Sequence, residues 1–221
     1  MTGITKIREF PLKKLFATVF IAVFSQVSFA GGMESLESFM KTARSGRSDF
    51  SQVVTAPGKN GEAPHSKTST GTFEFSRPNR FRFNYRKPFE QSIVADGQTL
   101  WLYDVDLNQV TARKQAQVLG STPAALIASS PDLNALKKDF ALEAIADRDG
   151  LQWVQATPKA KDGQLHDVKV GFRGNELAAL DILDSFGQRS VISFSKLEVN
   201  AQIPADSFHF KPPQGVDLVR Q

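Results

Sequence analysis

Short apolar runs joined by tight turns recur along this chain, and they constrain its fold more than any other feature. In the clearest example, the apolar runs 92–95 and 99–103 flank the pair Asp96-Gly97. An Asp-Gly pair between β-prone runs favours a hairpin, because the tight turn needs a positive φ that Gly adopts without strain. Similar pairs occur at 149–150, 162–163 and 174–175. The sequence therefore predicts a meander of short antiparallel strands.

Apolar and polar residues alternate within the predicted strands. Phe73 and Phe75 alternate with polar residues in one run, and Phe81 and Phe83 do so in the next. Residues two positions apart in a strand lie on the same face of a sheet, so one face is apolar and the other polar. Strand-like runs continue as far as 208–210, and we expect about eleven strands.

Three short helices are expected beside these strands. The first covers residues 33–44, where Leu36, Phe39, Met40 and Ala43 have helical spacing. The second covers 124–128, with Thr122 as its N-cap and Pro123 at the first helical position. The third covers 133–140 and follows the similar pair Ser130-Pro131. Because these helices are few, short and apolar, they cover the apolar face of the sheet without filling it. We therefore predict a mainly β fold of the α+β type, with a lined cavity under the helices.

Residues 1–30 have the pattern of a cleaved signal peptide. Basic residues from Lys6 to Lys14 precede a short apolar run, and Ser28-Phe29-Ala30 forms a small-x-small cleavage site. The run is too short to span a bilayer, and a buried core helix is the alternative explanation for it. We expect a single domain over 31–221 that is soluble after cleavage and located in the periplasm.

Charge and cysteine content exclude several classes of function. The chain has 27 basic and 23 acidic residues, but residues 1–30 hold four of the basic residues and one acid, which leaves a net charge of +1. This balance gives no support for nucleic-acid binding. The absence of Cys excludes disulfides, a catalytic thiol and a Cys-based metal site. Phe greatly outnumbers Tyr and Trp, which suits either a dry cavity lining or an ordinary core.

Motifs for catalysis are absent from the sequence. There is no Gly-x-Ser-x-Gly, no His-Glu-x-x-His, no phosphate-binding loop and no dinucleotide fingerprint. The spacing of His65, His166 and His209 does not suggest metal ligation. We expect no enzyme activity, no metal and no cofactor.

Arg77 allows two interpretations. It precedes Pro78, which places it in extended geometry at a strand end. It is either a solvated arginine at the rim or a clamp whose fork of donors binds the free carbonyl groups at the end of a short helix.

Five motifs in order resemble one family. They are Phe50-Ser51-Gln52, Arg77-Pro78-Asn79 with Phe81 and Phe83, Asp96-Gly97-Gln98-Thr99-Leu100-Trp101, Gly120-Ser121-Thr122-Pro123, and Pro212-Pro213-Gln214-Gly215-Val216. In these the chain is similar to the periplasmic outer-membrane lipoprotein carriers of the Lol (localisation of lipoproteins) system. The resemblance implies an incomplete antiparallel β-barrel with a lid of short α-helices over a hydrophobic cavity.

The resemblance also implies a function and a site. Such carriers accept lipoproteins from an inner-membrane ABC transporter, shield the acyl chains and pass them to an outer-membrane receptor lipoprotein; we expect a monomer. Arg77 matches the arginine that contacts the lid helices and gates the cavity. The predicted acyl-chain-binding residues are Leu36, Met40, Phe50, Phe73, Phe75, Phe81, Phe83, Ile93, Trp101, Leu126 and Ile127.

Two other functions stay open at this point. One is a periplasmic lipid-binding or lipid-sensing module of the same fold that has no transfer activity. The other is a hydrolase of envelope lipids, for which the sequence offers no recognisable nucleophile and base.

Overall fold

The computed structural model describes residues 31–221 except 59–61, 119–122, 129–131 and 161–163. The predicted signal peptide, the pair Asp162-Gly163 and the predicted caps Thr122 and Ser130 lie outside the described residues. The third helix has Asp132 as its N-cap instead, and the Asp132 carboxylate accepts a hydrogen bond from Ala135 N at 2.8 Å.

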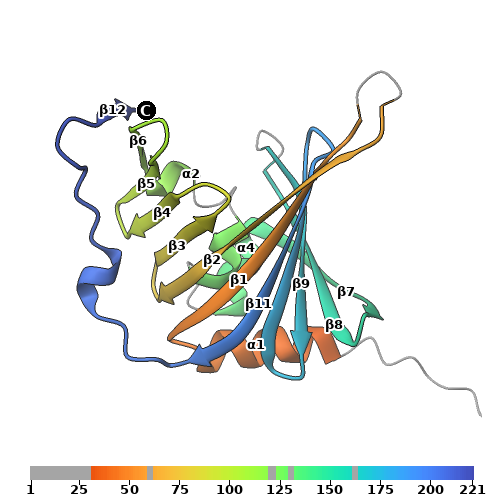
Figure 1. Ribbon diagram of the computed structural model, residues 1–221. Coiled ribbons are helices and arrows are strands. Elements are labelled where there is room, and N and C mark those ends of the chain that lie inside the picture. The colour runs from red at the N-terminus through yellow and green to blue at the C-terminus, as the bar shows by residue number, and fades with distance from the viewer. Residues whose placement is uncertain (1–30, 59–61, 119–122, 129–131, 161–163) are drawn as a thin grey trace, which may run out of the picture.

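One 12-stranded sheet forms most of the molecule, in the order β12-β6-β5-β4-β3-β2-β1-β11-β10-β9-β8-β7 (Figure 1). It curls into an open half-barrel that does not close, as the family resemblance implies. The strands are β1 (Ser45–Ala56), β2 (His65–Ser76), β3 (Arg80–Lys87), β4 (Gln91–Asp96), β5 (Thr99–Asp104), β6 (Gln109–Lys114), β7 (Phe140–Arg148), β8 (Leu151–Pro158), β9 (Leu165–Arg173), β10 (Glu176–Asp184), β11 (Arg189–Val199) and β12 (Asp217–Arg220).

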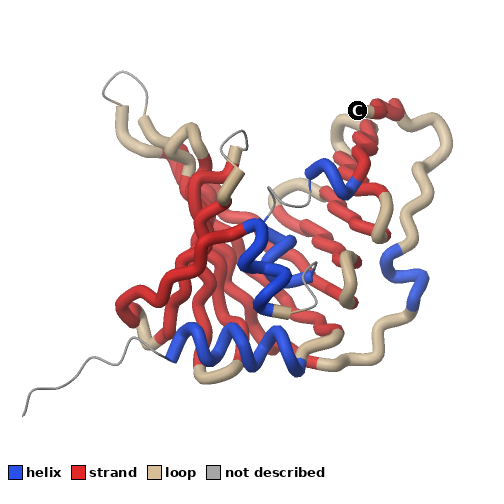
Figure 2. The backbone as a smooth tube through the Cα atoms, turned by 180° about the vertical axis from the view of Figure 1, so that it is seen from behind, coloured by secondary structure: helices blue, strands red, loops and turns tan. Residues whose placement is uncertain are grey.

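Short helices occupy the concave side of the sheet (Figure 2). They are α1 (Gly31–Thr42), α2 (Gln115–Val118), α3 (Pro123–Ala128) and α4 (Leu133–Asp139). Helix α1 packs on β7 to β10, α4 packs on α1 and β7, and α3 packs on β2 and β3. We call α1, α3 and α4 the lid helices. Helix α2 was not predicted, because its four residues show no helical period.

The predicted turns at 96–97, 149–150 and 174–175 are confirmed. Gly97, Gly150 and Gly174 have φ of 102°, 71° and 57°, the left-handed region that Gly adopts without strain. Asp96 also fixes its turn, because its carboxylate accepts hydrogen bonds from Gln98 N and Thr99 N at 2.8 and 2.7 Å. The register of the β4–β5 hairpin follows directly from this turn.

The prediction of a strand at 208–210 is wrong. Residues Ala205–Phe208 form a 3-10 helix, η2, and the next strand is β12, which pairs in parallel with β6. Pro204, Pro212 and Pro213 surround the segment, and proline has no N–H to donate to a strand ladder. The segment 200–216 instead crosses the convex side of β3 and β4, where η2 packs (Figure 1).

The apolar residues of the concave face and of the lid helices form the main core. Leu36 and Phe39 from α1, Leu126 and Ile127 from α3, and Phe75 from β2 are nearly inaccessible to solvent. A smaller cluster around Trp153 lies elsewhere on the sheet. None of the helices in the described ranges has the length and apolar character that a membrane crossing requires.

Candidate functional site

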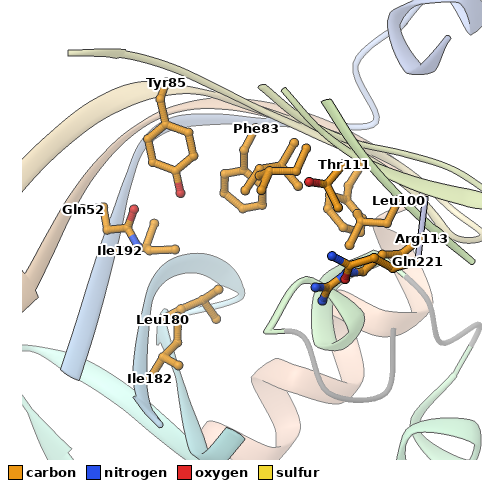
Figure 3. A pocket seen from close by; sticks show the side chains of 13 residues that line it. Gln52, Phe83, Tyr85, Leu100, Thr111, Arg113, Leu180, Ile182, Ile192 and Gln221 are labelled. Atoms are coloured by element: carbon orange, nitrogen blue, oxygen red, sulfur yellow. The ribbon is translucent and has the colours of Figure 1, made fainter. Parts of the chain in front are cut away.

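A cavity of ≈ 380 Å³ lies on the concave face of the sheet (Figure 3). One wall comes from β3 to β6 and the other from β1, β10 and β11, so strands far apart in the sheet order face one another across it. The curl of the sheet produces this arrangement. The lining residues are Gln52, Phe81, Phe83, Tyr85, Ile93, Leu100, Leu102, Thr111, Arg113, Leu180, Ile182, Ile192 and Gln221.

Three of the predicted acyl-binding residues line this cavity: Phe81, Phe83 and Ile93. Their place follows from strand register. Phe83 lies opposite Ile93, and Ile93 lies opposite Leu102, so one apolar row crosses three strands. Side chains at such paired positions share a face of the sheet, which keeps the wall continuous.

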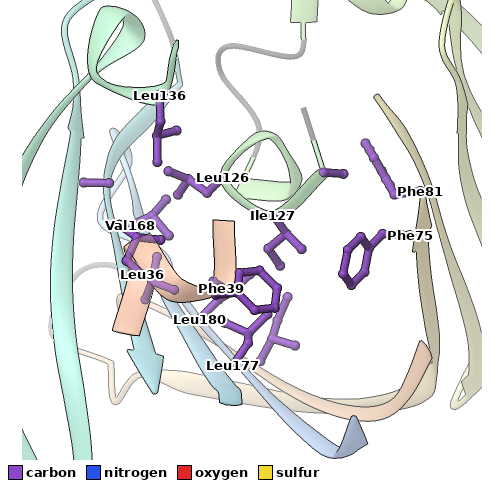
Figure 4. Packing of buried hydrophobic residues seen from close by; sticks show 14 of the residues in the cluster. Leu36, Phe39, Phe75, Phe81, Leu126, Ile127, Leu136, Val168, Leu177 and Leu180 are labelled. Carbon is purple, nitrogen blue, oxygen red and sulfur yellow. The ribbon is translucent and has the colours of Figure 1, made fainter. Parts of the chain in front are cut away.

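Seven further predicted residues form the core beside the cavity rather than its lining. They are Leu36, Met40, Phe50, Phe73, Phe75, Leu126 and Ile127, all buried. Figure 4 labels Leu36, Phe75, Leu126 and Ile127 among them. Aromatic contacts join this core to the cavity wall: the Phe83 ring centroid lies 4.4 Å from that of Phe73 and 5.4 Å from that of Phe50. The core and the cavity wall therefore form one continuous apolar surface on the concave face of the sheet.

The structure separates Trp101 from the predicted site. Leu100 and Leu102 line the cavity, so Trp101 between them points to the convex face. There its ring centroid lies 5.5 Å from that of Phe210, and its indole N–H donates to Asp96 Oδ2 at 2.9 Å. The prediction fails because this strand is apolar on both faces, and alternation then does not identify the inner one.

Arg77 is buried between the sheet and the lid helices. Its Nε donates to Ile127 O of α3 at 2.8 Å, and its Nη1 donates to Met40 O of α1 at 2.8 Å. Nη1 also lies 3.4 Å from Phe39 O. The last carbonyl groups of a helix have no partner within the helix, so a guanidinium fork can satisfy two helix ends at once. Because Arg77 is buried, it is not a solvated arginine at the rim.

The surroundings of Arg77 are apolar. Its guanidinium carbon lies 5.1 Å from the Phe39 ring centroid and 5.9 Å from that of Phe75. Burial lowers the pKa of Arg77 to about 10, and the positive charge of Arg44 contributes in the same direction. Within the described residues its partners are carbonyl groups, a thioether and aromatic rings rather than carboxylates. The contacts tie α1 and α3 to the sheet with directional bonds.

Sequence reasoning missed much of the cavity wall. Leu180, Ile182 and Ile192 lie on strands far along the chain, and only the curl of the sheet brings them opposite Phe83. The sequence predicts a strand-like run over 176–183 but not the strands that it faces across the cavity. Gln52 also lines the cavity, and its amide donates to Ser190 Oγ at 2.6 Å.

Tyr85 adds a polar atom to the cavity, into which its hydroxyl points (Figure 3). Burial raises the pKa of Tyr85 to about 12. The phenol is therefore a neutral hydrogen-bond donor at ordinary pH. In the part of the chain that the structure describes, no group of three or more His, Cys, Asp or Glu is placed to hold a metal ion.

The chain matches one protein family, described as outer membrane lipoprotein carrier protein LolA, over residues 41–211. It is 68% identical over 212 residues to an outer-membrane lipoprotein carrier protein of Albidiferax ferrireducens, covering 94% of this chain and 100% of the relative. A carrier of the same name from Methylibium petroleiphilum is 52% identical, covering 87% and 91%. A solved LolA superfamily protein from Nitrosomonas europaea has a TM-score of 0.48 at 12% identity, covering 81% and 98%. The chain belongs to the outer membrane lipoprotein carrier protein family.

Proposed function

We propose that this protein carries lipoproteins between membranes by holding their acyl chains in the concave cavity. The observation that supports this most directly is an apolar cavity walled by Phe83, Ile93 and Leu180 and bordered by helices that Arg77 ties to the sheet. The family match and the printed names of the relatives support the same cargo. This role requires binding and release, with no covalent step.

Burial of acyl chains accounts for the chemistry of the wall. Each CH₂ group removed from water contributes about 0.8 kcal/mol, so an acyl chain free in water is strongly disfavoured. Phe, Leu and Ile side chains supply contact area without directional bonds, which suits cargoes that share acyl chains and differ in protein sequence. A carrier that uses such a wall shields many lipoproteins equally well.

Loading requires the lid helices to move. The cavity of ≈ 380 Å³ is at the small end of the range of about 300–1,000 Å³ for sites that hold one drug-sized ligand, and a lipoprotein with several acyl chains needs more room. Because Arg77 holds α1 and α3 by hydrogen bonds to carbonyl groups, these bonds must break when the helices separate. We propose that the bonds bias the protein toward the closed state and so favour release.

The route follows from the same proposal. Residues 1–30 act as a signal peptide that is removed on export, and residues 31–221 work in the periplasm as a single domain. The protein receives lipoproteins from an inner-membrane ABC transporter and gives them to an outer-membrane receptor lipoprotein, as a one-to-one complex with its cargo.

Spheroplasts test this function. The purified protein is added to spheroplasts that make labelled lipoproteins, and soluble complexes are isolated from the medium. We expect one-to-one complexes with the natural protein, none with Ile93→Glu, and normal amounts with Arg86→Glu, which places a new carboxylate at an exposed position of β3. Lipoproteins that stay in the membrane while the protein binds a fluorescent fatty acid would show a lipid-binding module without carrier activity.

A further inference from the structure

We propose that the cavity also binds a single-chain lipid with an anionic headgroup, and that Arg113 holds this headgroup. The inference rests on the proposed function in one respect, because both need the cavity to accept an acyl chain. It adds a polar recognition site, and it makes anionic lipids a second class of ligand.

Three polar residues gather at one end of the apolar cavity: Thr111, Arg113 and Gln221 (Figure 3). Thr111 and Arg113 alternate along β6, so they share its concave face. Strand β12 pairs in parallel with β6, and Val219 lies opposite Thr111. Two residues further along both strands, Gln221 therefore lies beside Arg113. Gln221 N–H donates to Ala112 O at 3.0 Å, which fixes this register.

The cavity between this end and the opposite end is apolar. Arg113 lies directly across from Leu100, and Thr111 lies across from Leu102. Gln52 and Tyr85 line the other end (Figure 3). A ligand that fills the cavity therefore meets an apolar wall along its length and a cation at the β6 end.

Arg113 differs from the arginines that stabilise the fold. Arg148 and Arg189 both pair with Asp181, at 2.9 and 2.7 Å. The ion pairs among the described residues do not include Arg113, so its guanidinium has no carboxylate partner there. It is also exposed, and its charge remains available to a ligand.

The chemistry of this end selects a carboxylate or a phosphate. A guanidinium fork binds either group through two parallel N–H···O bonds, and charge-assisted bonds of this kind are about twice as strong as neutral ones. The size of the cavity suits one chain. Fatty acids and lysophospholipids combine one acyl chain with such a headgroup.

Binding measurements on the delipidated protein test this assignment. The probes are palmitate and 1-palmitoyl lysophosphatidate, each below its critical micelle concentration, and the neutral 1-hexadecanol below its solubility limit. We expect Arg113→Gln to weaken binding of both anions about tenfold, while binding of hexadecanol changes less than twofold. Lys114→Gln is the matched control, because Lys114 is the next residue of β6 and its side chain points to the opposite face.

The outcomes separate this inference from the carrier function. Loss of hexadecanol affinity as large as the loss of palmitate affinity would overturn the headgroup site, and so would equal effects of the two substitutions. Effects on lysophosphatidate alone would restrict the ligand to phosphates. If hexadecanol and the anions all fail to bind, the cavity assignment itself is wrong. Normal release of lipoproteins by Arg113→Gln shows that the carrier function does not depend on the headgroup site.

Discussion

Arg77 is a buried cation whose partners among the described residues are uncharged. Burying a charge without an opposite charge is costly, and here hydrogen bonds to Ile127 O and Met40 O and two aromatic rings offset the cost. The same residue therefore provides hydrogen-bond donors to carbonyl groups of two helices and carries an unfavourable free energy of desolvation. We infer that the closed arrangement of α1 and α3 is more stable than an open one, but by only a small free energy.

Arg77→Leu tests this balance. The substitution removes the donors to α1 and α3, so we expect faster amide hydrogen exchange in α3 and slower release of lipoprotein, with uptake changed less. Arg86→Leu, at an exposed position of β3, is the control. Exchange in α3 and transfer kinetics like those of the natural protein would show that Arg77 does not hold the lid helices.

Asp96 makes the β4–β5 turn sensitive to acid. Burial alone would raise the pKa of Asp96, but hydrogen bonds from Thr99 N, the Trp101 indole and Gln98 N outweigh it and lower the pKa below its usual value. A carboxyl with a lowered pKa in the folded state contributes stability above its unfolded pKa. That contribution disappears as the pH falls through the folded pKa.

The corresponding prediction concerns Asp96→Asn. We expect it to reduce the free energy of unfolding at pH 7 and to have a smaller effect near pH 3, as followed by urea denaturation at both pH values. Asp106→Asn, on the neighbouring β5–β6 turn, should change little at either pH. A deficit of Asp96→Asn that is equal at both pH values contradicts the ionic role of this carboxylate.

At the scale of elements, the segment 200–216 covers the convex face of β3 and β4. Phe208 is 2% exposed, and Arg82 Nη1 donates to Ser207 O at 3.0 Å. Phe210 covers Trp101 and Tyr103. This second layer explains why β5 carries apolar side chains on both faces, with Leu102 toward the cavity and Trp101 and Tyr103 toward the segment.

Phe208→Ala is expected to lower the free energy of unfolding by about 3–5 kcal/mol, the usual cost of truncating a buried Phe. His209→Ala is the control, because its side chain is exposed and surface substitutions usually change stability by about 0.5 kcal/mol or less. Denaturant unfolding measures both. If the two variants have equal stability, the segment does not support the sheet.

The short helices depend on packing rather than on their own stability. Helix α3 has six residues, and isolated helices of that length are not stable in water. Its described side chains Leu126 and Ile127 are buried against the core, and Arg77 binds one of its carbonyl groups. When such a helix separates from the sheet, it therefore loses the contacts that stabilise its helical structure.

At the scale of the whole molecule, local signals in the sequence predict the sheet but not its curl. The Gly turns and the alternation of Phe73, Phe75, Phe81 and Phe83 locate strands and their apolar face, since both depend on neighbouring residues. The cavity wall opposite Phe83 depends on the curl of the sheet, which no local pattern encodes. The prediction that Trp101 lines the cavity fails for a related reason, because its strand is covered on both faces.

The central claim is that acyl chains occupy the concave face of the sheet. Leu102 and Tyr103 test it, because they are adjacent in β5 and point to opposite faces. The photocrosslinker p-benzoylphenylalanine replaces each in turn, and complexes released from spheroplasts are irradiated. The account predicts crosslinks to the lipoprotein acyl chains from position 102 and none from position 103. Equal crosslinking from both positions, or crosslinking from position 103 alone, would contradict it.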